Sequence, residues 1–269
     1  RGNSVFATVL HTEWRDFKIN IIDTPGFDDF AGEMISSLRV ADTCVLVINA
    51  QHGAEVGTDL IWNYINQFNK PLIFAINQMD HPKADFDYAL TSLKEHYGKA
   101  VTPMQYPVNQ GEGFNAIVDL LKMVMYKFSA EGGKPEKLPI PDSEKEKANT
   151  LHNELVEKAA ENDEKLMEKY FEKGTLDEDE LREGLKLGMV HHDVFPVFVM
   201  SAKKNMGTGR MMGFIDNVAP SPHDAKPEKT TTGKELCYDQ SQPAVLFVFK
   251  SHIEPNLGRS LTSKYYQVK

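Results

Sequence analysis

Apolar runs and apolar residues at helical spacing alternate along much of the chain, and they predict strands and helices in turn. Short apolar runs bounded by polar or turn residues are typical of strands, and they predict strands at residues 4–10, 17–23, 43–50, 72–77 and 194–200. Helical spacing predicts helices at residues 30–39, 58–68, 86–97 and 208–218. Because strands that alternate with helices form parallel sheets, the sequence predicts the α/β class, with a doubly wound, mainly parallel sheet.

The alternation is interrupted in the middle of the chain. Residues 102–108 have the composition of extended segments, and residues 114–128 are compatible with either a helix or strands. Charged amphipathic helices are expected at residues 143–161, 163–171 and 177–187. We interpret this region, about residues 100–192, as an α+β subdomain inserted into the first domain.

The end of the chain predicts a second domain. Residues 219–242 are rich in Pro, Thr, Lys and Gly, as linkers are. Apolar runs at residues 244–250 and 261–268, separated by Pro255, Asn256 and Gly258, predict a β-hairpin. We therefore expect a first domain at residues 1–222, a linker at 223–242 and the beginning of a β-barrel domain at 243–269.

Composition narrows the class of protein. With 269 residues, 41% of them hydrophobic, the chain can bury a full core, and no segment approaches the roughly 20 continuous apolar residues that cross a bilayer. The chain is therefore expected to have no membrane partner. Two cysteines, Cys44 and Cys237, are too few for a disulfide framework, so a cytoplasmic protein is expected. The net charge of −9 does not exclude an RNA partner, because many of the acidic residues lie in residues 142–186.

Short polar motifs follow three of the predicted strands. They are Asp23-Thr24-Pro25-Gly26-Phe27, Asn77-Gln78-Met79-Asp80 and Ser201-Ala202-Lys203. Each motif alone has an ordinary structural interpretation, as a strand ending in a Pro-Gly turn, an Asx turn and a common tripeptide. Open α/β sheets bind ligands at the carboxyl ends of their strands. The order and placement of the motifs therefore favour a GTP-binding domain.

The residue types suit the parts of a magnesium nucleotide. The carboxylate of Asp23 can orient Mg²⁺ through water, and Gly26 lets its backbone N–H approach a γ-phosphate. The carboxylate of Asp80 can accept two hydrogen bonds from guanine, where adenine lacks both donors. Ser201, Ala202 and the Lys203 stem would pack around the same base.

A phosphate-binding loop of the pattern Gly, four residues, Gly-Lys and Ser or Thr is absent from the sequence. We expect this loop to lie upstream of Arg1.

Taken together, these motifs resemble those of the translational GTPases, and specifically bacterial elongation factor G. Arg1-Gly2-Asn3-Ser4-Val5 looks like the family's switch I, with Ser4 at the position of a threonine that ligates magnesium. Residues 23–30 resemble switch II, residues 77–80 the guanine motif, and residues 155–170 part of the inserted subdomain. The resemblance covers nearly the whole chain.

The resemblance implies a P-loop-GTPase-like fold and binding of GTP or GDP with Mg²⁺ at Ser4 and Asp23. It also implies a role on the ribosome in tRNA and mRNA translocation. The implied partner is the factor-binding region of the large subunit with its rRNA, with no DNA partner and a monomer off the ribosome.

Two residues depart from the family. The family has a histidine at position 27, thought to position the attacking water, and the phenyl ring of Phe27 has neither donor nor acceptor. We therefore expect weak or absent GTP hydrolysis. The family has a lysine at position 78, so the shorter, neutral Gln78 should weaken nucleotide affinity while Asp80 preserves specificity.

Three functions stay open at this point. The chain could belong to an elongation factor that hydrolyses GTP, to a non-hydrolysing factor that works by occupying the ribosome, or to a ribosomal protection protein of the antibiotic-resistance type. The acidic segment at residues 142–186 favours the elongation factor, and Phe27 favours the non-hydrolysing factor.

Overall fold

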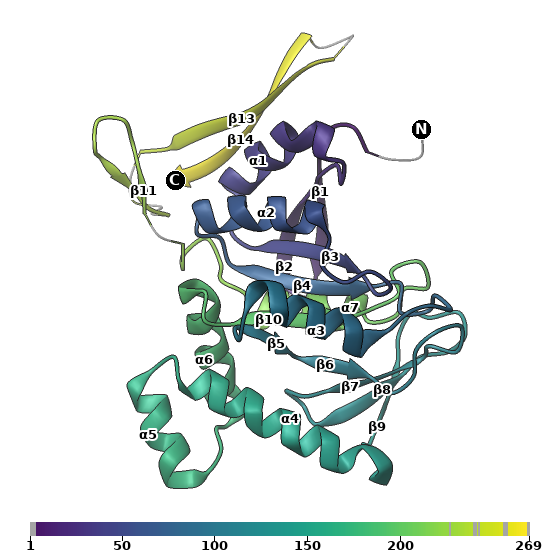
Figure 1. Ribbon diagram of the computed structural model, residues 1–269. Helices are drawn as coiled ribbons and strands as arrows, with labels where there is room; N and C mark the ends of the chain where they lie inside the picture. Colours follow the sequence, from purple (N-terminus) through teal and green to yellow (C-terminus); the bar gives the residue numbers. More distant parts are fainter. Residues whose placement is uncertain (1–3, 226, 239–240, 242, 255–257, 268–269) are drawn as a thin grey trace. The chain divides into compact units, whose positions relative to one another are not determined.

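A computed structural model describes residues 4–225, 227–238, 241, 243–254 and 258–267. The chain divides into two compact units (Figure 1). The first unit contains the described parts of Arg1–Thr43, Asn63–Lys70 and Pro220–Lys269, and the second contains Cys44–Trp62 and Pro71–Ala219. We describe each unit by itself.

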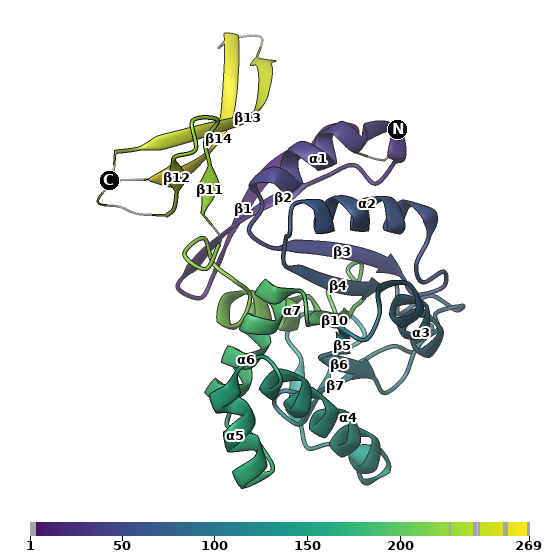
Figure 2. The ribbon, with the colours of Figure 1, turned by 60° about the vertical axis from the view of Figure 1, so that its left-hand side comes forward.

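The second unit is built on a parallel sheet with the strand order β3-β4-β10-β5. Figures 1 and 2 show α3 and α7 on opposite faces of this sheet. The elements are β3 (Cys44–Asn49), α2 (Val56–Gln67), β4 (Leu72–Asn77), α3 (Phe86–Tyr97), β5 (Val101–Pro103), β10 (Phe195–Val199) and α7 (Thr208–Asn217). The predicted α/β class with a doubly wound parallel sheet is confirmed. The last residues of α2 belong to the first unit.

Strand β4 lies inside this sheet. Its residues 72–76 are all fully buried, and β10 on one side of it is buried along its whole length. A parallel strand covered on both faces has no solvent side, so it appears in the sequence as a continuous apolar run. This explains why the sequence predicted the bounds of β4 correctly.

The region interpreted as an insertion contains a second, antiparallel sheet of order β6-β7-β8-β9. The backbone of Met104 connects it to the parallel sheet, because Met104 N donates to Val197 O at 3.0 Å and Met104 O accepts from Leu120 N at 2.9 Å. Its strands are β6 (Gln105–Pro107), β7 (Ala116–Asp119), β8 (Val124–Lys127) and β9 (Glu136–Leu138). The ambiguous residues 114–128 therefore form strands, which turn at Met123 with φ 49°.

Three helices complete the second unit, close to their predicted limits. They are α4 (Asp142–Ala160), α5 (Glu164–Lys173) and α6 (Glu178–His191). Helix α6 begins with a capping box, in which Asp177 accepts from Glu180 N and Glu180 accepts from Asp177 N. A Cβ atom at Gly184 would lie 2.4 Å from Ala159 O, so α4 and α6 pack with backbone close to backbone.

The first unit begins with an antiparallel hairpin of β1 (Thr8–Trp14) and β2 (Phe17–Asp23), followed by η1 (Asp28–Phe30) and α1 (Ala31–Val40). The strand predicted at residues 4–10 was placed too early in the sequence, because the observed strand β1 covers Thr8–Trp14. Arg15 adopts φ 54° and reverses the chain, so pairing of Trp14 with Phe17 sets the register from the turn outward. No glycine marks that turn in the sequence.

The C-terminal part of the first unit contains two small antiparallel ladders. One pairs β11 (Glu228–Lys229) with β12 (Glu235–Leu236), inside the region predicted as a linker, and the other is the predicted hairpin, β13 (Val245–Glu254) with β14 (Gly258–Gln267). Pro255, Asn256 and Val268 of the predicted hairpin lie outside the described residues. The proposed domain limits stay predictions.

Within the ranges that the structure describes, no helix is both long and apolar enough to span a bilayer.

Candidate functional site

The loop after β4 carries the motif Asn77-Gln78-Met79-Asp80. Gln78 adopts φ 64°, and its carbonyl accepts from His81 N at 2.9 Å, so the chain turns immediately after the strand. The fully buried Met79 fixes the turn, because its N donates to Met200 O at 3.2 Å and its O accepts from Gly111 N at 2.8 Å. The turn is therefore held by the backbone of two neighbouring segments.

The loop after β10 carries Ser201-Ala202-Lys203. The fully buried Ser201 exchanges two backbone hydrogen bonds of 3.0 Å with Met206, which closes the loop. Gly207, with φ 87°, follows; a Cβ atom there would lie 2.4 Å from Val199 O. Only glycine fits this close approach. The side chains of Ala202 and Lys203 are left exposed.

A side-chain hydrogen bond joins the two loops. Ala202 N donates to Asn77 Oδ1 at 2.9 Å. On the same loops, Lys204 Nζ lies 3.8 Å from Asp80 Oδ2, and the Asp80 side chain is 17% exposed. The structure thus brings Asn77, Asp80 and Ala202 together at the carboxyl ends of adjacent parallel strands, where an acceptor-only carboxylate can receive the donors of a ligand.

Two further residues belong to this site, and the sequence reasoning missed both. Lys204 lies next to Asp80, and Asn49 at the end of β3 donates from Nδ2 to Gln78 Oε1 at 3.3 Å. Asn49 Oδ1 accepts from Gln51 N at 2.8 Å, which fixes the orientation of its amide. The signal for Asn49 was its place at the carboxyl end of the neighbouring strand, and the signal for Lys204 was its place beside the third motif.

The first unit holds the other predicted site residues. Ser4 Oγ donates to Asp23 Oδ2 at 3.3 Å, so the structure brings together the hydroxyl and the carboxylate predicted to hold Mg²⁺. Hydroxyl, carboxylate and water oxygens are the ligands that this hard cation prefers, so the donor set fits the ion. Asp23 and Ser4 are both exposed.

The loop after β2 presents small or apolar groups. The Thr24 side chain is partly exposed and Pro25 is buried. Gly26 is exposed, with nothing within 4 Å of the place its Cβ would occupy. The Phe27 residue is 56% exposed, and its carbonyl accepts from Phe30 N at 3.0 Å at the start of η1. An open backbone at Gly26 leaves room for a phosphate oxygen, and the ring of Phe27 offers no hydrogen-bonding group to a water.

The chain is similar to several known proteins. A family model described as the elongation factor Tu GTP binding domain matches residues 1–221. An elongation factor G-like protein from Thermotoga maritima is 31% identical over 268 residues, which are 98% of this chain and 38% of that relative. A crystal structure of a protein from Thermus thermophilus has a TM-score of 0.84 at 22% identity, covering 98% of this chain and 38% of that chain. The chain thus spans 38% of the length of each of these two proteins.

Proposed function

Because the chain belongs to the elongation factor Tu GTP-binding domain family and is related to elongation factor G, we propose that it binds guanine nucleotides with Mg²⁺ and acts on the ribosome. The observation that carries the proposal is the 2.9 Å hydrogen bond from Ala202 N to Asn77 Oδ1. It holds the loop that contains Asp80 against the loop that contains Lys203, as a base-binding site requires.

In this proposal Asp80 reads the base. Its carboxylate accepts from the ring N–H and the exocyclic amine of guanine, and the ammonium of Lys204, 3.8 Å from Asp80 Oδ2, orients the carboxylate. Asn77 positions Ala202, while Gln78, held by Asn49, is a weaker substitute for a cation near the phosphates. Ser4 and Asp23 would hold Mg²⁺, and the bound ion would neutralise phosphate charge.

The base-reading role is tested with Asp80→Asn in the complete natural protein. An amide replaces one acceptor by a donor, so the variant should lose guanine and gain xanthine, which carries a carbonyl in place of the exocyclic amine. We expect GDP affinity to fall by at least about tenfold and xanthosine diphosphate affinity to rise, measured by calorimetry. An equal loss for both nucleotides would assign Asp80 a structural role and remove it from the site.

Phe27 supports a second candidate, a factor that binds GTP and the ribosome but hydrolyses GTP weakly or not at all. The Phe27 residue is 56% exposed, and its phenyl ring offers no donor or acceptor to an attacking water. The γ-phosphate would then act by differential affinity, by ordering the segments around Ser4 and Asp23. For the first candidate, the hydrolysing factor, the step of translation that we propose is tRNA and mRNA translocation.

Ribosome-stimulated phosphate release separates the two candidates. We expect Phe27→His to raise the rate by about a hundredfold, the usual contribution of a positioned water-binding side chain, while the matched apolar control Phe27→Leu leaves it unchanged. A natural protein that turns over as fast as its histidine variant is an ordinary GTPase, and the non-hydrolysing candidate fails.

The proposed partner is the factor-binding region of the large ribosomal subunit, including its rRNA, and the proposed compartment is the cytoplasm. We propose that the protein is a monomer off the ribosome. Cosedimentation with ribosomes, stronger with a non-hydrolysable GTP analogue than with GDP, is the expected result. If cosedimentation with ribosomes is the same with the GTP analogue, with GDP and without nucleotide, the proposal that nucleotide controls ribosome binding is wrong.

A further inference from the structure

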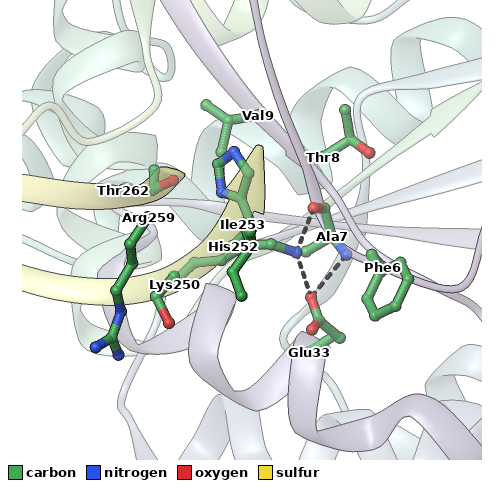
Figure 3. A pocket seen from close by; sticks show the side chains of 11 residues that line it. Phe6, Ala7, Thr8, Val9, Glu33, Lys250, His252, Ile253, Arg259 and Thr262 are labelled. Atoms are coloured by element: carbon green, nitrogen blue, oxygen red, sulfur yellow. Dashed lines mark hydrogen bonds and ion pairs between the residues drawn. The ribbon is translucent and has the colours of Figure 1, made fainter. Parts of the chain in front are cut away.

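Three segments of the first unit that are far apart in the sequence meet at one ammonium group (Figure 3). Lys250 Nζ on β13 donates to Ala7 O and to Glu33 Oε2, both at 2.7 Å. Ala7 N donates in turn to the same Glu33 Oε2 at 2.8 Å. Both backbone groups of Ala7 are therefore bound by one Lys–Glu pair, and the pair lines a pocket together with Phe6, Thr8 and Arg259.

The pair is partly withdrawn from water. The side chains of Lys250 and Glu33 are 18% and 29% exposed, and Lys250 Nζ also lies 5.5 Å from the centroid of the Phe6 ring. Burial by itself would raise the pKa of Glu33, but the hydrogen bonds from Lys250 and Ala7 and the charge of Lys250 together lower it. Charge-assisted hydrogen bonds in such surroundings are stronger than those between neutral groups.

The acceptors of Lys250 follow the two predicted nucleotide-sensing segments. Ala7 comes three residues after Ser4, and Glu33 lies in the first turn of α1, just beyond the loop that begins at Asp23. A displacement of either segment moves one acceptor of Lys250. The ammonium can then keep both acceptors only if the other segment or β13 follows.

Helix α1 is bound to the C-terminal part of the unit at its other end as well. Lys264 Nζ on β14 donates to Val40 O at 2.8 Å and to Asp42 Oδ1 at 2.5 Å. Lys264 has nearly the same chemistry as Lys250, and its side chain has the same exposed fraction, 18%. It therefore provides a matched control that binds α1 without binding Ala7.

We propose that Lys250 is a positioning residue that couples the segments after Ser4 and Asp23 to the β13–β14 hairpin, so that their order and the position of the hairpin change together. This inference rests on the proposed function where it concerns nucleotides. Coupling is reciprocal, so a hairpin that holds both segments in place must also favour the ligand that orders them.

The coupling itself is tested by hydrogen exchange on the complete natural protein without nucleotide. In Lys250→Met, the amides of residues 6–9 and of the first turn of α1 should exchange about tenfold faster or more. Lys250→Arg should restore protection, and Lys264→Met should affect only the end of α1. Faster exchange confined to β13 in Lys250→Met would overturn the proposal.

The nucleotide side is tested by the ratio of the affinities for a GTP analogue and for GDP. Lys250→Met should lower the preference for the triphosphate by about fivefold or more, with Lys264→Met within about twofold of the natural protein. An equal loss of both affinities indicates a merely structural lysine and overturns the inference. If the natural protein binds neither nucleotide, the proposed function fails, and the exchange experiment alone decides whether Lys250 couples the segments.

Discussion

Replacing Arg210 by methionine should destabilise the second unit strongly, because Arg210 on α7 is the charged partner of a buried carboxylate. Arg210 Nη2 lies 3.2 Å from Asp119 Oδ2, and the two side chains are 20% and 4% exposed. The guanidinium also lies 4.3 Å from the centroid of the Tyr126 ring. Asp119 and Tyr126 lie on strands of the antiparallel sheet, so one arginine connects α7 to that sheet.

The size of this destabilisation depends on the hydrogen bonds that the Asp119 carboxylate keeps when Arg210 is replaced. Removal of one partner of a buried ion pair costs about 3–5 kcal/mol. Asp119 Oδ1 still accepts from Leu121 N at 3.1 Å and Lys122 N at 3.0 Å, so the lower end of that range applies. Loss of the contact with the Tyr126 ring adds about 1 kcal/mol. We expect Arg210→Met to lower the free energy of unfolding by about 4 kcal/mol.

A double-mutant cycle measured by urea unfolding isolates the pair. Asp119→Asn keeps an acceptor for the two backbone amides, so the double variant should be less destabilised than the sum of the single variants by about 1–2 kcal/mol. The control is Arg182→Met on α6, whose partner Glu178 is 50% exposed, and it should cost less than about 1 kcal/mol. A coupling near zero, or equal costs for the two arginines, would refute the reasoning.

Three further predictions concern local features. Asp177→Ala removes the cap of α6 and should cost about 1 kcal/mol in urea unfolding, whereas Asp177→Asn, which keeps the acceptor, should cost almost nothing. Gly184→Ala should cost about 1–3 kcal/mol, because the new methyl group would lie 2.4 Å from Ala159 O; an unchanged unfolding midpoint would show that α4 and α6 can separate freely. The pKa of Glu33, followed by carboxyl NMR, should lie below its ordinary 4.5 and rise in Lys250→Met. Because a lowered pKa stabilises the fold at pH values above the unfolded-state pKa, the natural protein should lose this stabilisation as the pH falls below about 4.5. A pKa of Glu33 that does not change in the variant would contradict the pairing.

The sequence was sufficient where one local signal decided the structure. Strand β4 is a continuous apolar run, and α3 begins after Asp85, whose side chain accepts from Tyr88 N. Both elements have the bounds that the pattern predicted, since burial on two faces and a helix cap leave a direct trace in the residue types.

The sequence did not predict features that depend on how segments pair or on turns without a typical turn residue. The turns at Arg15 and Met123 use positive φ without glycine, so the start of β1 was misplaced and residues 114–128 stayed ambiguous. In the candidate site, the order of the motifs indicated Asn77 and Asp80, but the groups that hold them, the backbone N–H of Ala202 and the ammonium of Lys204, lie on the loop after β10. No pattern near residue 78 indicates that Asn49 binds Gln78, because their contact depends on β3 lying beside β4.

The position of β10 between β4 and β5 has a consequence for folding during synthesis. The nascent chain completes β4 and β5 long before residues 195–199 exist, yet both strands have β10 as their neighbour in the sheet. Until then, each keeps a row of unpaired backbone groups, which is where polypeptides join edge to edge and aggregate. Residues 104–194 must be made and their ends brought together before β10 can pair with both strands, so the edges of β4 and β5 stay unpaired during that part of synthesis.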